Sequence, residues 1–249
     1  MRTGASNDLV PRTPALQRVA TAVFFAVLLL RPVPSFGQPG RPPVGLKGFT
    51  LGGLFPSGAF DSHVGRDGGV AAIHLALRSG LSPLFVGFEL SASYYGHVHR
   101  HAYMDNIPEV QLDVDTYNNI VQGLFFLRLQ PRVGDVSPYV EGLAGISYIF
   151  TDTTVSDGDA QDDFAYDINF DDWTVTAGAG AGVVVRLRGR PGGGGGGMFL
   201  DFKVRYMAGG RASYLRQGGV VVEGDRVTYT VDRSATNFFT VQAGLTWFF

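Results

Sequence analysis

The stretch Asn237–Phe249, NFFTVQAGLTWFF, alternates between apolar and polar residues. Every second residue from Phe239 to Phe249 is apolar, whereas the positions between them, from Thr240 to Thr246, hold threonine, glutamine or glycine. Successive side chains of a β-strand point to opposite faces. The stretch is therefore predicted to be a strand with one apolar and one polar face. A soluble β-sandwich has strands of the same kind, so alternation alone does not separate soluble from membrane proteins.

The same period of two recurs along the chain, and no long apolar helical pattern interrupts it. Connections after the second, fourth and sixth segments are short, whereas those after the first, third, fifth and seventh are longer. An even number of strands with this alternation places both ends of the chain on the short-turn side of a barrel. The seven preceding segments cover residues 45–55, 70–78, 84–95, 120–130, 139–150, 173–188 and 198–208.

An apolar run of twelve residues, Val19–Leu30, lies near the amino terminus behind three arginines. A membrane-spanning helix needs about twenty such residues, so this run is too short to be one. The basic flank, the short apolar core and the small residues Ser35 and Gly37 predict a secretory signal peptide. A buried helix is the alternative. The predicted organisation is a signal peptide at 1–37, a linker at 38–43 and a barrel domain at 44–249.

Composition excludes several function classes. The net charge is −2 and no basic stripe is present, so nucleic acid is not an expected partner. The chain has no cysteine, which excludes disulfides, zinc–thiolate sites and cysteine nucleophiles. No cofactor is predicted.

The terminal aromatic residue, with apolar residues stepping back from it by twos, resembles the closing strand and assembly signal of small bacterial outer-membrane β-barrel proteins. The residues that carry this signal are Val241, Leu245, Trp247 and Phe249. The resemblance implies an all-β, eight-stranded, antiparallel up-and-down transmembrane barrel in the outer membrane. It also implies recognition by the barrel-assembly machinery and contact with outer-membrane lipid and lipopolysaccharide. In this family structural and surface-interaction roles are common and catalysis is rare.

In such a barrel the apolar face of each strand meets lipid and the charged face points inward. Eight strands leave an interior just wide enough to be filled by side chains. We therefore predict a charge-paired plug in the periplasmic half of the lumen, with an excess of basic residues. This excess leaves a narrow channel for small solutes or anions open as an alternative function. The predicted network comprises Arg78, Glu89, Arg128, Glu141, Arg186, Arg188, Asp201, Lys203 and Arg205.

Two segments hold residue types that bind metals. His97, His99 and His101 alternate along one predicted strand extension and could present imidazoles to one ion, or they are solvated histidines. The segment 151–172 is rich in aspartate and contains no basic residue. Its spacing departs from the EF-hand loop, so either calcium binding or simple solubility accounts for the charges. No metal site is predicted from these patterns.

An enzyme that modifies lipid is a further alternative. Ser93, His99 and Asp105 can be written as a serine, histidine and carboxylate constellation, but no spacing singles it out. The glycine run at 192–197 lacks the lysine and helix of a phosphate-binding loop and is predicted to be a flexible turn. The leading hypothesis is therefore a non-enzymatic envelope protein.

The last long loop contains two alternating stretches, 211–215 and 227–232. They predict a β-ribbon that projects above the membrane or adds a pair of strands to the barrel. Exposed strand edges of this kind can bind an extended partner. The ligand or partner at the surface is not predicted.

Overall fold

The computed structural model describes residues 43–80, 83–104, 107–131, 133–157, 163–189, 196–223 and 226–249. Along 97–116, 152–170 and 215–230 it describes the backbone alone. The predicted signal peptide at 1–37 lies outside the described residues, as does most of the predicted linker at 38–43.

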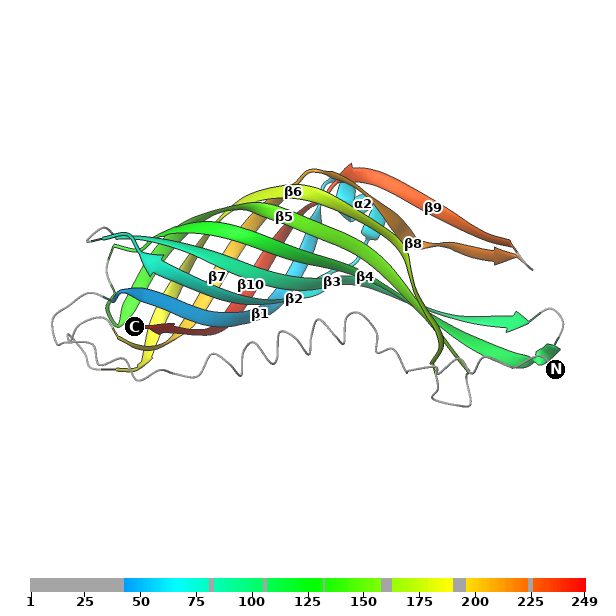
Figure 1. The fold of residues 1–249 in the computed structure, drawn as a ribbon, viewed down its shortest axis with the longest axis horizontal. Helices are drawn as coiled ribbons and strands as arrows, with labels where there is room; N and C mark the ends of the chain where they lie inside the picture. Colours follow the sequence, from blue (N-terminus) through cyan, green and yellow to red (C-terminus); the bar gives the residue numbers. More distant parts are fainter. Residues whose placement is uncertain are drawn as a thin grey trace, which may run out of the picture.

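The described residues form a closed barrel of eight strands in the order β1-β10-β7-β6-β5-β4-β3-β2 (Figure 1). Every pairing is antiparallel, which confirms the predicted eight-stranded up-and-down barrel. β1 closes the barrel against β10, from Leu46 opposite Phe248 to Ser57 opposite Asn237. The barrel strands are β1 (Gly45–Ser57), β2 (Gly68–Arg78), β3 (Leu84–Met104), β4 (Ile107–Leu129), β5 (Val136–Asp157), β6 (Asp163–Arg188), β7 (Gly197–Gly209) and β10 (Asn237–Phe248).

The last long connection forms its own two-stranded sheet. β8 (Arg211–Glu223) pairs with β9 (Arg226–Ala235), from Arg211 opposite Ala235 to Glu223 opposite Arg226. These strands lie where the sequence predicts a ribbon, and they add no strand to the barrel. Near its start β8 contacts β3, β5 and β6, so it passes over the outer mouth of the barrel.

Three consecutive residues of β4 show which way the faces point. Phe125 is 70% exposed, whereas Leu124 and Phe126 on either side are each 1% exposed. The same alternation surrounds the barrel with an apolar outer belt. A soluble monomer rarely exposes a contiguous apolar surface of this kind. The belt includes Leu51, Leu75, Val86, Leu127, Val140, Ile146, Val175, Val204 and Val241.

Four strands continue well beyond the closed part of the barrel. β2 pairs with β3 only as far as Tyr94, whereas β3 pairs with β4 as far as Met104 opposite Ile107. β5 and β6 pair as far as Ser156 opposite Asp163. The outer parts of β3, β4, β5 and β6 therefore form a projecting sheet, which Figure 1 shows extending past the barrel rim. The longer connection expected between the segments 84–95 and 120–130 is mostly paired strand.

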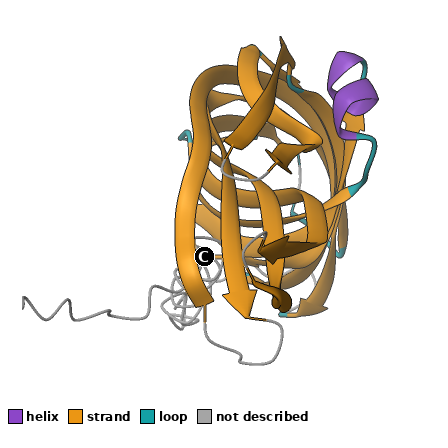
Figure 2. Cartoon of the chain, turned by 90° about the vertical axis from the view of Figure 1, so that its right-hand side faces the viewer, coloured by secondary structure: helices purple, strands orange, loops and turns teal. Residues whose placement is uncertain are grey.

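The sequence also failed to predict the helix α2 (Ala59–Val64), which follows β1. Figure 2 shows it at the rim of the outer end. Phe60 and Val64 are buried on one side of this single turn and a half. No helix in the described part of the chain is long and apolar enough to cross a membrane.

Candidate functional site

The interior site is seated against β6, whose segment 176–182 reads TAGAGAG. Its alanines face outward and its glycines face the lumen. A Cβ on Gly180 would lie 2.7 Å from Cγ of Arg205, and one on Gly182 would lie 2.5 Å from the phenol oxygen of Tyr139. Glycine is needed at both positions because these large side chains occupy the space. The absence of side chains at these positions of β6 thus leaves space in the lumen for Arg205 and Tyr139.

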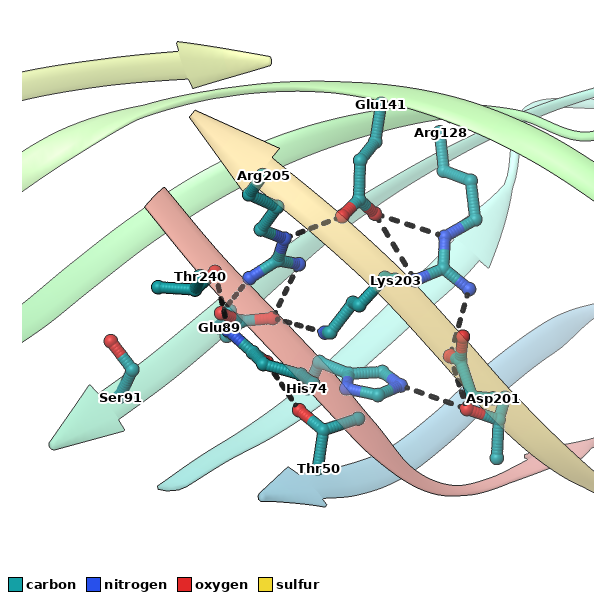
Figure 3. Close-up of polar contacts among 12 residues, drawn as sticks. Thr50, His74, Glu89, Ser91, Arg128, Glu141, Asp201, Lys203, Arg205 and Thr240 are labelled. Atoms are coloured by element: carbon teal, nitrogen blue, oxygen red, sulfur yellow. Dashed lines mark hydrogen bonds and ion pairs between the residues drawn. The ribbon is translucent and has the colours of Figure 1, made fainter. Parts of the chain in front are cut away.

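The charged layer crosses the barrel interior and is almost free of solvent contact (Figure 3). Its residues come from β3, β4, β5 and β7, and none is more than 4% exposed. Its members are Glu89, Arg128, Glu141, Asp201, Lys203 and Arg205.

Arg205 links the two glutamates of the layer. Its Nε donates to Glu141 Oε1 at 2.6 Å, and its two Nη atoms donate to the two carboxylate oxygens of Glu89. Two parallel bonds from one guanidinium to one carboxylate are among the strongest polar contacts in proteins. Lys203 Nζ donates to Glu89 Oε2 at 3.3 Å. Glu89 lies on β3 and its partners lie on β7, so these bonds cross the lumen between strands that are not neighbours.

Arg128 completes the layer on the other side. Its Nη2 lies 3.1 Å from Glu141 Oε2, its Nη1 lies 3.6 Å from Asp201 Oδ2, and its guanidinium carbon lies 3.8 Å from the Tyr139 ring centre. Tyr139 donates its hydroxyl to Asp201 Oδ1 at 2.6 Å. Each ion therefore lies against an opposite charge, which buried ions require.

The layer contains three basic and three acidic side chains and is neutral as a unit. His74 borders it, with Nε2 3.2 Å from Oγ1 of Thr246, whose hydroxyl donates to Asp201. Because water scarcely reaches these side chains, the layer fills the cross-section of the lumen. Chemically, it can hold the strands in register and close the interior.

Three of the nine predicted network residues lie elsewhere. Arg186 pairs with Asp135 at 3.0 Å, where Asp135 precedes β5, and its guanidinium lies over the Phe199 ring. Arg78 lies over the Phe85 ring at 5.6 Å, and Arg188 is exposed. The predicted basic excess depended on these three arginines, so it is absent from the layer that the structure describes.

Aromatic rings also occupy the short-turn end of the lumen. The side chains that fill the lumen next to the short turns are Phe85, Phe199 and Phe248. The ring centre of Phe248 lies 6.0 Å from that of Phe85 and 4.9 Å from that of Phe199. The charged layer lies on the inner side of these rings, and Arg128 is one residue from the short-turn end of β4. The sequence indicates that these phenylalanines face inward, because Phe85 shares a strand face with Glu89 and Phe199 shares one with Asp201. Sequence reasoning assigned the apolar residues to lipid and overlooked those of inward parity.

The structure describes the candidate metal-binding and catalytic residues only in part. Ser93 is buried in the outer half of the lumen, on β3. His97, His99 and His101 lie in paired strand rather than in a loop, and their side chains lie outside the described part. Asp105 and most side chains of 151–172 lie outside it as well. Among the side chains that the structure describes, no group of three or more acidic, histidine or cysteine residues could hold a metal ion.

The predicted assembly-signal residues Val241, Leu245, Trp247 and Phe249 share the parity of the outward face of β10. Val241 is 50% exposed, and the Trp247 ring centre lies 6.1 Å from that of Phe49 on β1. Their recognition by an assembly machinery stays a prediction.

Aromatic pairs surround both ends of the outer belt. Tyr148 lies 4.6 Å from Trp173 between ring centres at the outer end, where Tyr206 also lies 4.8 Å from Phe239. Trp247 lies near the short-turn end. Aromatic girdles at the two membrane–water interfaces flank the apolar band of a transmembrane barrel.

Comparison with known proteins gave matches among solved structures only. No protein-family model and no curated protein matches the chain. The chain is similar to the crystal structure of Neisserial surface protein A (13% identity, TM-score 0.42), covering 82% of this chain and 97% of that one. It is also similar to a major outer membrane protein of Thermus thermophilus (13% identity, TM-score 0.44, 82% and 99% covered). A third match is the attachment invasion locus protein of Yersinia pestis with a heparin analogue (13% identity, TM-score 0.32, 82% and 99% covered).

The assignment to a membrane depends on the chain's own surfaces. A closed barrel leaves no strand edge unpaired in hydrocarbon, where each unpaired backbone group would cost several kcal/mol. An apolar belt between aromatic girdles, around a polar and charged interior, is the arrangement of outer-membrane barrels. The chain is an eight-stranded β-barrel protein of the outer membrane.

Proposed function

We propose that this protein is a non-enzymatic outer-membrane barrel that acts through its projecting outer strands. The observation that carries this proposal is the division of the molecule into a filled interior and an extended outer sheet. The interior supports a structural role, because the charged layer leaves no room for a conducting path at its level. The outer sheet offers unpaired strand edges on the extracellular side, and such edges bind extended partners.

The sequence of the outer sheet favours interaction over passive projection. Between 102 and 127, and again between 151 and 185, the chain contains acidic residues and no lysine or arginine. Two of these acidic residues, Asp171 and Asp172, lie within β6 and are the first of that strand whose side chains the structure describes. A negative surface of this kind attracts cationic partners and divalent ions that bridge lipopolysaccharide phosphates. The lipid and lipopolysaccharide around the barrel, and the assembly machinery during biogenesis, are its further proposed partners.

The surface role is tested by shortening the projecting sheet. A variant in which short turns replace 97–116 and 152–170 keeps the whole closed barrel. Cells that display the full chain should retain more fluorescent polylysine than cells that display the shortened barrel at equal surface amount. Equal retention would contradict the surface role, and heat-modifiable gel mobility of both proteins provides the folding control.

The channel and enzyme alternatives have separate tests. Planar bilayers that contain the purified barrel should show no steady unitary conductance. Steps that disappear when Arg128 and Arg186 are neutralised would instead establish the channel. Mass spectra of lipid A from cells with and without the protein should be identical, and a mass change would establish an enzyme.

A further inference from the structure

The helix α2 is joined to the barrel by a glycine at each end. Gly58 precedes it with φ 64°, and Gly65 ends it with φ 62°. A Cβ at either position would meet nothing within 4 Å, so the backbone conformation alone favours glycine there. No side chain caps the amino end of the helix. The attachment of α2 therefore depends on the side chains of one face.

That face inserts an aromatic ring into a slot between two tyrosines. Phe60 is fully buried, with its ring centre 5.1 Å from that of Tyr95 and 5.2 Å from that of Tyr214, which meets it edge-on at 86°. Both separations are those of favourable aromatic pairs. A chain of polar contacts holds the helix alongside, since His63 Nδ1 lies 2.9 Å from the Tyr214 hydroxyl and that hydroxyl lies 2.6 Å from Ser234 Oγ.

One wall of the slot is set by an irregularity in β3. Tyr95 is the extra residue between the pairs Tyr94–Asn119 and Gly96–Asn118. Tyr95 keeps the inward parity of Ser91 and Ser93 and is fully buried against Phe60, at the point where the bulge bends the strand. Bulges are enriched next to functional sites.

Two buried hydroxyls on β3 have no hydrogen-bond partner among the residues that the structure describes. They are the phenol of Tyr95 and Oγ of Ser93, two residues deeper on the same face of β3, and both residues are at most 2% exposed. Buried hydroxyls are nearly always hydrogen-bonded, so each exception needs an explanation. A polar substituent on a ring that occupied the slot would supply the missing partner.

We propose that the slot between Tyr95 and Tyr214 is a binding site for a small aromatic molecule that carries a hydroxyl group. Phe60 occupies this site in the closed state. Rotation of α2 about Gly58 and Gly65 withdraws Phe60 and admits the ligand from the outer end, because the charged layer closes the lumen below. The proposal does not depend on the surface role of the projecting sheet.

Cysteine labelling of the full chain in lipid vesicles tests the opening. The protein has no cysteine, so Ser93→Cys places a single buried thiol on β3, two residues deeper in the lumen than Tyr95. Alanine at Gly65 disfavours the closed conformation, and we expect about fivefold faster maleimide labelling from a strain of about 1 kcal/mol. Gly80→Ala is the matched control, because Gly80 has φ 58° with nothing within 4 Å but lies in a short turn at the other end. Ser137→Cys, buried near the short turns, should show no acceleration.

Phenol is the probe for the ligand. It should slow the labelling of Ser93→Cys severalfold and raise the unfolding temperature of the unmodified protein. Tyr95→Phe should reduce the thermal shift produced by phenol while leaving the shift produced by toluene unchanged. If Gly65→Ala labels no faster than Gly80→Ala, α2 is a fixed part of the wall and the proposal is wrong. If phenol does not raise the unfolding temperature of the unmodified protein, the ligand assignment is wrong. The assignment is also wrong if phenol raises the unfolding temperature of Tyr95→Phe by the same amount. Neither measurement requires a cysteine variant to fold.

Discussion

Replacing Glu89 with glutamine should destabilise the barrel strongly, because it removes the carboxylate that accepts bonds from both Arg205 and Lys203. The charged layer would then hold three cations and two anions, away from water. Among the ion pairs that the structure describes, Lys203 has Glu89 as its carboxylate partner. Removing one member of a buried pair costs about 3–5 kcal/mol, and we expect a loss in that range.

The assay is reversible urea unfolding in lipid vesicles, followed by the fluorescence of Trp173 and Trp247. Lys203→Met alone leaves Glu89 bonded to Arg205, so it should cost less. The double variant restores equal numbers of cations and anions, and a coupling on the order of 0.5–3 kcal/mol should appear in the double-mutant cycle. This coupling distinguishes paired charges from independent ones.

Asp135→Asn is the matched control, since Asp135 also pairs with an arginine but its side chain is 69% exposed. An exposed pair contributes about 0–1 kcal/mol, so this change should be small. If Glu89→Gln costs no more than Asp135→Asn, and the cycle shows no coupling, the layer is hydrated and our account of the sealed interior is incorrect.

Two further substitutions test the outer and inner faces. Phe125→Arg should cost about 2–4 kcal/mol in vesicles, because it places a cation in the lipid belt, and a neutral effect on the same unfolding assay would mean that Phe125 faces water. Gly182→Ala should cost about 1–3 kcal/mol by displacing Tyr139. Gly142→Ala, where a Cβ would meet nothing within 4 Å, should be nearly neutral. Equal midpoints for the two alanine variants would show that the glycines of β6 are not needed for space.

Much of the fold follows from local patterns. The period of two located every barrel strand, since a strand buried on one side and exposed on the other repeats with that period. The same rule was not applied at 96–119, although the alternation of Val110, Leu112 and Val114 continues the strand pattern there. The helix α2 was missed because six residues are too few for a helical period to show.

The interior was only partly predictable for a different reason. The position of a residue in the alternation of its strand shows whether it faces inward. On that basis Glu89, Lys203 and Arg205 were assigned to the lumen, where the structure has them. Which of them meet depends on the tilt and stagger of strands that are distant in sequence. That is why Arg186 was grouped with these charges although it lies at the level of Asp135.

The distribution of charge over the strands constrains the order in which this barrel enters the bilayer. β3, β4 and β5 together bring two interior carboxylates and one guanidinium, and β7 brings the two cations that balance them along with Asp201. A partly inserted sheet that ended at β6 would leave Glu89 without either of its partners. Such an intermediate is too costly to persist in hydrocarbon. Insertion is therefore expected to be concerted from β3 through β7, with the seam between β1 and β10 closing last.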